Sequence, residues 1–146
     1  MGFFDIFKKK KKVEQSVKAE PDSQLFHGVY NLISEHLPKK WDRLAIYYAV
    51  VNNMVDFKYY VDLGKGYVAC FNLKDFSKES FRALRSALGD VLLEERKQLQ
   101  QDKQWSVFSM FVSSSGKFKI NFGYDNISET FHQYHENWEK ENIKNK

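Results

Sequence analysis

The chain has 146 residues, of which 42% are hydrophobic and 16% aromatic, which suits one domain with one apolar core. Its only cysteine, Cys70, excludes an intramolecular disulfide, and no apolar run reaches the roughly 18 residues that a membrane-spanning helix needs. Half of the formal net charge of +4 lies in residues 1–24, so the rest is nearly balanced and gives no argument for direct nucleic-acid binding. We expect a cytoplasmic protein.

The N-terminus, MGFFDIFKKKKK, places aromatic residues before a run of lysines. This order is wrong for a secretory signal, and Ile6 stands where an N-myristoylation motif favours Ser or Thr. Two interpretations are open: residues 1–24 form a flexible tail and linker, or the tail makes weak contact with an anionic membrane surface. The membrane contact would use Phe3, Phe4, Phe7, Lys8, Lys9, Lys10, Lys11 and Lys12.

The single folded domain is predicted over residues 25–146. A first helix is expected to begin at Asp22 or Ser23, because both can cap a helix, and to end at Pro38. Alternating apolar residues then predict three strands joined by Asn- and Gly-containing turns. These strands are expected at Arg43–Val51, Val55–Leu63 and Tyr67–Leu73.

In the second half of the chain, the spacing of the apolar residues changes from every second residue to that of a helix. Apolar residues at helical spacing predict a long helix over Lys78–Gln101. A hairpin follows at Trp105–Tyr124, with Phe118, Ile120, Phe122 and Tyr124 on one face, and a last helix at Ser128–Asn142. The order α-β-β-β-α-β-β-α predicts an α+β fold, in which a five-stranded antiparallel sheet carries three helices on its apolar face.

No motif for catalysis or for a cofactor is found. Cys70 is expected to be buried and inert. His132 and His135 lie three residues apart and suggest a metal site with Glu136 or Glu139, but the further ligands would have to include His27 or His36. We therefore predict neither a metal, nor a cofactor, nor an enzyme.

Several large aromatic residues do not fit the core face that the alternation defines. They are Trp41, Tyr47, Tyr60, Trp105 and Trp138. Exposed Tyr and Trp are typical of binding surfaces, whereas helices on both faces of the sheet would bury them. Both interpretations stay open at this point.

The ordered pattern of motifs from Leu25 onward resembles the YezG-type antitoxins, immunity proteins of Gram-positive bacteria that are paired with LXG-type polymorphic toxins. The residues that carry the resemblance are Leu37-Pro38-Lys39-Lys40-Trp41, Phe57-Lys58-Tyr59-Tyr60, Glu95-Arg96, Ser115-Gly116-Lys117-Phe118, Phe122-Gly123-Tyr124-Asp125-Asn126 and Trp138. The resemblance implies a cytoplasmic, non-catalytic protein that binds the C-terminal toxic domain of a toxin exported by type VII secretion, often a nuclease. Because nuclease inhibitors tend to be acidic and this domain is nearly neutral, a different target also stays open.

We expect the toxin to contact exposed residues of a preorganised surface. The candidates are Tyr60, Glu94, Glu95, Asp102, Asp125, Asn126 and Trp138. Replacement of Tyr60 or Trp138 by alanine is expected to cost about 2 kcal/mol of binding free energy if either is a hot spot. The alternative function is a peripheral membrane adaptor anchored by the N-terminal Phe- and Lys-rich tail.

Overall fold

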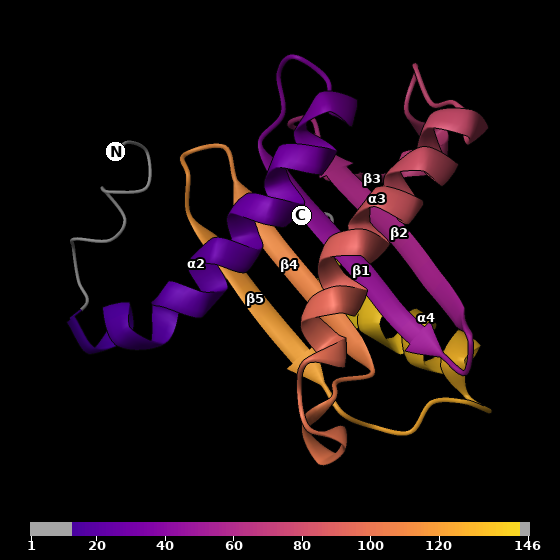
Figure 1. Cartoon of the computed structure of the whole chain (residues 1–146). Helices are drawn as coiled ribbons and strands as arrows, with labels where there is room; N and C mark the ends of the chain where they lie inside the picture. The colour runs from indigo at the N-terminus through magenta and orange to yellow at the C-terminus, as the bar shows by residue number, and fades with distance from the viewer. Residues whose placement is uncertain (1–12, 144–146) are drawn as a thin grey trace.

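The elements of the chain follow the predicted α+β order. The computed structural model describes residues 13–143 (Figure 1). Its helices and strands are α2 (Val13–Ile33), β1 (Arg43–Val51), β2 (Met54–Asp62), β3 (Tyr67–Ala69), α3 (Lys78–Lys97), β4 (Val107–Ser113), β5 (Phe118–Gly123) and α4 (Phe131–Asn142). Short 3-10 turns lie at Ser34–His36, Cys70–Asn72 and Gln101–Lys103.

The five strands form one antiparallel sheet in the order β3-β2-β1-β4-β5. Strand β1 is central, and its hairpin with β2 closes at the pair Val51 and Met54. The two-residue connection uses Asn52 at a φ of 56°, a left-handed conformation that asparagine tolerates better than most residues. The turn chemistry that the sequence indicates therefore sets the register of the central strands.

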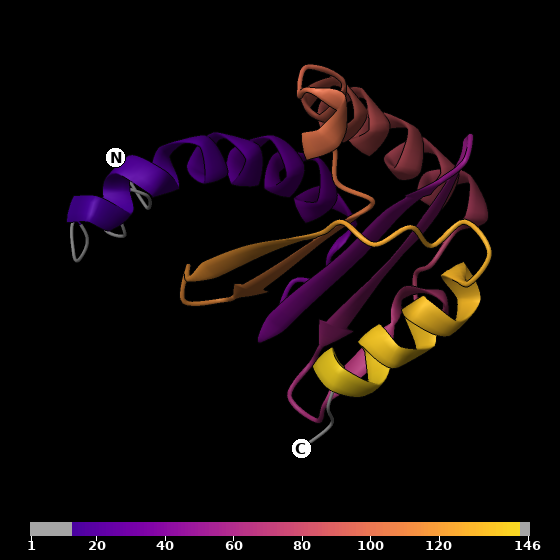
Figure 2. The same cartoon turned by 90° about the horizontal axis from the view of Figure 1, so that it is seen from below.

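Helices cover both faces of the sheet, in contrast to the single covered face that we predicted. Helices α2 and α3 lie on one face and α4 lies on the other (Figure 2). The main core between α2, α3 and the sheet includes Phe26, Ile33, Leu88 and Phe108, all at most 1% exposed. A second core beneath α4 contains Ala45, Tyr47, Ala49, Val51, Tyr60, Val107, Ile127 and Trp138.

Several boundaries differ from the predicted ones. Helix α2 begins at Val13 and continues through Pro21, although an interior proline removes a backbone hydrogen bond and argues for a later start. Strand β3 is shorter than predicted because the chain turns at Cys70. That residue is buried, as expected, and burial raises the pKa of its thiol. Tyr124 lies beyond the end of β5 and is 60% exposed, so it does not continue the buried face of that strand.

Helix α3 is anchored at both of its ends. Ser77 caps the N-terminus, where its Oγ accepts a hydrogen bond from the Ser80 N–H at 3.2 Å. At the other end Arg96 donates to the carbonyl of Trp105, and its guanidinium lies 5.6 Å from the centre of that indole ring. The predicted helix is shortened to Lys97, and a 3-10 turn leads into β4. The Arg96 contacts tie the C-terminal end of α3 to Trp105, just before β4.

Candidate partner-binding surfaces

Tyr60 and Trp138, which we predicted to be exposed, are 2% and 8% exposed in the structure. Trp138 projects from α4 onto the sheet, where its ring lies 4.9 Å from Tyr47 and 5.9 Å from Phe111, measured between ring centres. Tyr60 comes from β2 and lies 5.8 Å from the same indole. The expected exposure is therefore wrong. The cause is α4, which covers the face opposite the main core.

A network of polar side chains surrounds Tyr60 beneath α4. The Tyr60 hydroxyl donates to Glu139 Oε2 at 2.5 Å, and Lys58 Nζ donates to the same oxygen at 2.8 Å. His135 Nε2 lies 2.9 Å from the Tyr60 hydroxyl, and its Nδ1 lies 3.0 Å from Asp56 Oδ2. His135 and Glu139 of α4 are thus held by side chains of β2, namely Asp56, Lys58 and Tyr60.

The surroundings shift the acidity of two members of this network. Burial raises the pKa of Tyr60, and its hydrogen bond to Glu139 raises it further. Burial also tends to raise the pKa of Glu139, but hydrogen bonds from Lys58 and Tyr60 outweigh that effect and lower it below its ordinary value of 4.5. The pair is therefore a neutral phenol beside an ionised carboxylate at neutral pH.

The arrangement holds α4 in place against β2. The Tyr60 hydroxyl is already bonded to Glu139, and the His135 ring stacks on Tyr47 with 3.8 Å between ring centres. Within residues 23–143, no group of three or more His, Cys, Asp or Glu is placed to hold a metal ion. His132, suggested above as a ligand beside His135, is exposed.

The lowered pKa of Glu139 predicts a pH-dependent contribution to stability. A carboxylate with a lower pKa in the folded state stabilises the fold above its unfolded pKa, and this stabilisation is lost as the pH falls through the folded pKa. We expect Glu139→Gln to reduce stability at neutral pH and to show a smaller further loss on acidification below about pH 4.5.

Urea denaturation of wild type and Glu139→Gln, at neutral pH and below about pH 4.5, measures this difference. The exposed Glu136 of the same helix supplies the matched control, Glu136→Gln. Asp62 also has a lowered pKa, because hydrogen bonds from Gly64, Arg43 and Gly66 outweigh its burial. Asp62 is present in wild type, Glu139→Gln and Glu136→Gln, so its contribution cancels when their acid responses are compared. An acid response of Glu139→Gln equal to that of wild type would contradict the prediction.

The three acidic candidates near the end of α3 have different surroundings. Glu95 is half-buried, and its Oε1 accepts a hydrogen bond from Trp105 Nε1 at 3.2 Å. The Glu95 carboxylate therefore helps to fix the orientation of the indole. Glu94 is exposed and accepts from Gln98 at 3.1 Å, whereas Asp102 is exposed in the 3-10 turn that follows. Of the three, Glu94 and Asp102 are accessible to a partner.

Asp125 and Asn126 are both exposed where the chain leaves β5. Asn126 Oδ1 accepts from the N–H of Ser128 at 3.1 Å and from its hydroxyl at 2.9 Å. Ser106 Oγ donates to the backbone carbonyl of Asp125 at 2.7 Å, which fixes the start of this segment. The segment passes the end of the sheet at which α3 also ends (Figure 1). The exposed Asp125 carboxylate is thus carried on an ordered loop.

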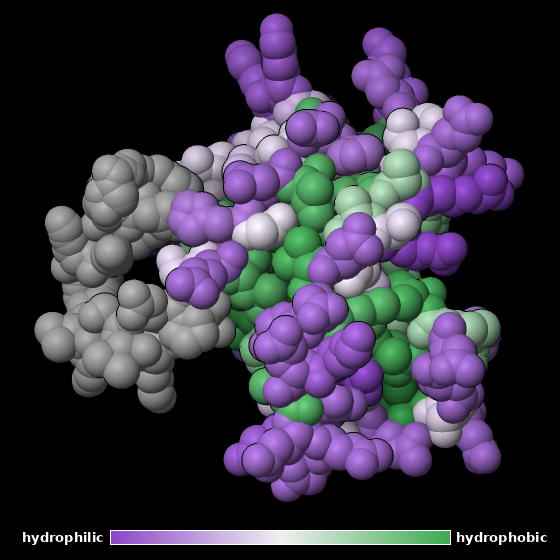
Figure 3. Space-filling view, viewed as in Figure 1, coloured by the Kyte–Doolittle hydropathy of each residue, from purple (hydrophilic) through white to green (hydrophobic). Residues whose placement is uncertain are grey.

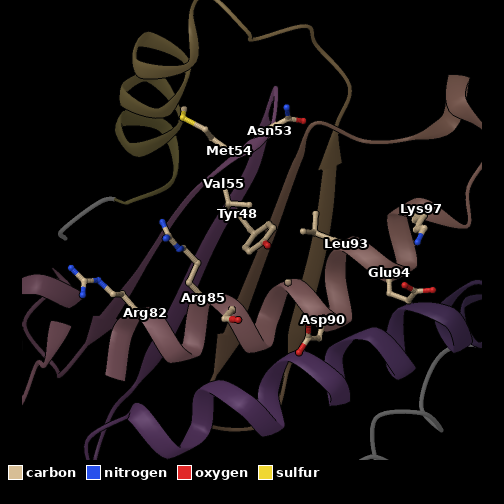
Figure 4. A pocket seen from close by; sticks show the side chains of 12 residues that line it. Tyr48, Asn53, Met54, Val55, Arg82, Arg85, Asp90, Leu93, Glu94 and Lys97 are labelled. Atoms are coloured by element: carbon tan, nitrogen blue, oxygen red, sulfur yellow. The ribbon is translucent and has the colours of Figure 1, made fainter. Parts of the chain in front are cut away.

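An open groove of about 900 Å³ lies between α3 and the β1–β2 hairpin. In the space-filling view, apolar surface is visible between these elements (Figure 3). Figure 4 shows Arg85 and Leu93 on the side of α3 that faces Tyr48 and Val55. The residues that line the groove are Tyr48, Asn53, Met54, Val55, Arg82, Arg85, Ser86, Gly89, Asp90, Leu93, Glu94 and Lys97.

Of the residues that line this groove, only Glu94 is among the contact candidates predicted from the sequence. The other lining residues of α3 are mostly polar or charged, a composition that is also typical of an ordinary solvated helix face. One signal was present: Ser86 and Gly89 are small residues that interrupt it. A Cβ built on Gly89 would lie 3.2 Å from the Tyr48 hydroxyl, so glycine lets that tyrosine reach the helix.

The membrane-contact candidates, Phe3 to Lys12, lie outside the described residues. Among the described residues, no helix has the length and apolar character needed to cross a membrane. A search of curated proteins finds no match to the chain. A family model described as "Immunity protein YezG-like" matches residues 23–145.

Proposed function

We propose that this chain, which belongs to the YezG-like immunity protein family, binds the toxic domain of a cognate toxin and blocks it without catalysing a reaction. The family match over residues 23–145 is the observation that carries the proposal, and it supports an immunity role with a toxin as partner. The further proposal is that this partner is an LXG-type toxin of a Gram-positive bacterium, exported by type VII secretion. The chain would then act in the cytoplasm of the cell that makes the toxin.

The physical mechanism that we propose is occlusion by a preorganised surface. A rigid surface loses little conformational entropy on binding, so more of the contact free energy remains as affinity. The sheet, the anchored α3 and the bonded α4 supply such rigidity, while Glu94, Asp102, Asp125 and Asn126 offer accessible polar groups. His135 and Glu139 hold α4 against β2, so we assign both residues a structural role.

Co-expression tests the proposal directly. Each C-terminal toxic domain of the LXG-type toxins of the source organism is expressed in a heterologous host, with and without this chain. Rescue of growth by one pairing, together with a stoichiometric complex on size exclusion, is the expected result. Growth arrest by every toxic domain despite expression of the chain would overturn it.

The same system separates a nuclease from another target. If the rescued toxic domain degrades DNA or RNA in the purified state, titration with the chain should stop the degradation at one equivalent per binding site. If the rescued toxic domain degrades neither DNA nor RNA, the chain neutralises a toxin with a different activity.

The tail-anchored adaptor remains the alternative function, and truncation separates the two. A variant that lacks residues 1–12 should protect cells as well as the full chain if the domain neutralises the toxin. Binding of the full chain, but not of the truncated variant, to vesicles of anionic lipid, with no protection by either protein, would favour the adaptor.

A further inference from the structure

The groove between α3 and the β1–β2 hairpin has an apolar floor and charged ends. Val55 and Leu93 are half-buried within it, and Met54 at its rim is 55% exposed. Ser86 is a small, exposed residue of the α3 wall, whereas the space beside Gly89 is filled by the Tyr48 hydroxyl. The hollow is open to solvent along its length, which suits a polypeptide segment better than an enclosed small molecule.

Its charges are arranged in order along α3. Arg82 and Arg85 lie at one end, Asp90 lies between, and Glu94 and Lys97 lie toward the other (Figure 4). Both arginines are exposed, and neither forms an ion pair with another residue of the described part of the chain. Covering such arginines by a partner is costly unless the partner supplies carboxylates. The basic end is therefore a site for acidic side chains.

Two other occupants fit the groove less well. A nucleic-acid backbone carries phosphates at every step, and Asp90 and Glu94 in the same wall would repel them. A second copy of this chain could meet Arg82 and Arg85 only through the carboxylates of its own groove, Asp90 and Glu94, so a two-fold interface would need both sets of contacts in one register. A segment of the toxin needs only one complementary stretch.

We propose that this groove binds a segment of the toxic domain that places Asp or Glu against Arg82 and Arg85 and an apolar side chain over Val55 and Leu93. The inference rests on the proposed function and specifies its surface. Arginine forks bind carboxylates through paired hydrogen bonds, which gives this end of the groove its selectivity. The apolar contact supplies the buried centre that hot spots of protein interfaces require.

Charge reversal at the basic end is the first test. The double variant Arg82→Glu/Arg85→Glu should bind the rescued toxic domain at least about tenfold more weakly in calorimetry. The matched control is Lys117→Glu/Lys119→Glu, which makes the same change of net charge at exposed positions at and beside β5. The control should bind within about threefold of wild type. Circular dichroism and thermal unfolding verify the fold, and Arg82→Gln/Arg85→Gln replaces the first variant if it does not fold.

A crosslink identifies the occupant. A photoreactive phenylalanine is placed at Ser86 in the groove, and the control carries it at the exposed Ser80 of the same helix. We expect Ser86 to crosslink to a toxin segment that contains Asp or Glu, and Ser80 to give no such product.

The outcomes separate this inference from the function on which it rests. Unchanged affinity of the arginine variant, an equal loss in the lysine control, or a crosslink from Ser86 to a second copy or to a segment without carboxylates would overturn the inference, while the immunity role would stand. Failure of the wild-type chain to bind or neutralise any toxic domain would overturn the proposed function itself.

Discussion

Replacing Trp138 with alanine is expected to lower the free energy of unfolding by about 3–5 kcal/mol, the range measured for loss of large buried aromatic residues. The indole is 8% exposed and packs on Tyr47, Tyr60 and Phe111. Its removal leaves a cavity between α4 and the sheet, which the polar contacts of His135 and Glu139 do not fill. Urea denaturation measures the loss.

Trp138→Phe is the control for the Trp138→Ala variant, because it keeps an aromatic ring in the second core and should recover much of the lost stability. The result also tests the binding role predicted from the sequence. A loss of about 2 kcal/mol in toxin binding with unchanged unfolding would mean that the indole acts as a contact. We expect instead that Trp138→Ala lowers the free energy of unfolding, and that any weaker binding to the toxin is a consequence of this lower stability.

Replacing Tyr60 with alanine should have a comparable effect, again about 3–5 kcal/mol of unfolding free energy. The ring is 2% exposed between the sheet and Trp138, and its hydroxyl bonds to Glu139 beside His135. Alanine removes both the packing and the hydrogen bonds in one step. The same denaturation experiment measures the change.

Tyr60→Phe separates the two contributions, because it keeps the ring and removes only the hydroxyl. We expect a loss of about 1–3 kcal/mol, the usual result when a buried hydrogen-bonding partner is deleted. Amide exchange in α4 should accelerate in this variant more than exchange in α3, because only α4 is bonded to Tyr60. Equal acceleration in both helices would show that the hydroxyl stabilises the whole domain and not α4 in particular.

The sequence predicts the element order well because its local signals are strong. The Asn52-Asn53 turn sets the register of the hairpin, and the alternation in β5 places Phe118, Ile120 and Phe122 toward the main core. These signals act over a few residues and are visible without tertiary contacts.

The coverage of the second sheet face is a tertiary property that alternation alone does not reveal. One signal pointed to it: β1 carries no charged residue from Leu44 to Val51, which is typical of a strand buried on both faces. Treating this run as a one-sided strand leads to the expectation that Tyr60 and Trp138 are exposed. The partners of Tyr60, His135 and Glu139, come from residues more than seventy positions later, so the sequence pattern does not indicate them.

The candidate surface could be predicted only in part for a similar reason. Glu94, Asp102, Asp125 and Asn126 are exposed, as polar residues at helix ends and strand exits usually are. The groove depends on how α3 crosses the hairpin, and this crossing is set by contacts between elements, such as Phe81 of α3 stacked on Phe57 of β2. The role of these residues in binding stays a prediction.

Helix α4 follows in the chain every strand that it covers, and this order has a consequence during synthesis. Until residues 131–142 have left the ribosome, the aromatic face that contains Tyr47 and Tyr60 has no cover from α4. A chain cut short before this point would present that face to proteases and to other unfinished chains. We therefore expect a chain that lacks α4 to be degraded faster than one that carries it.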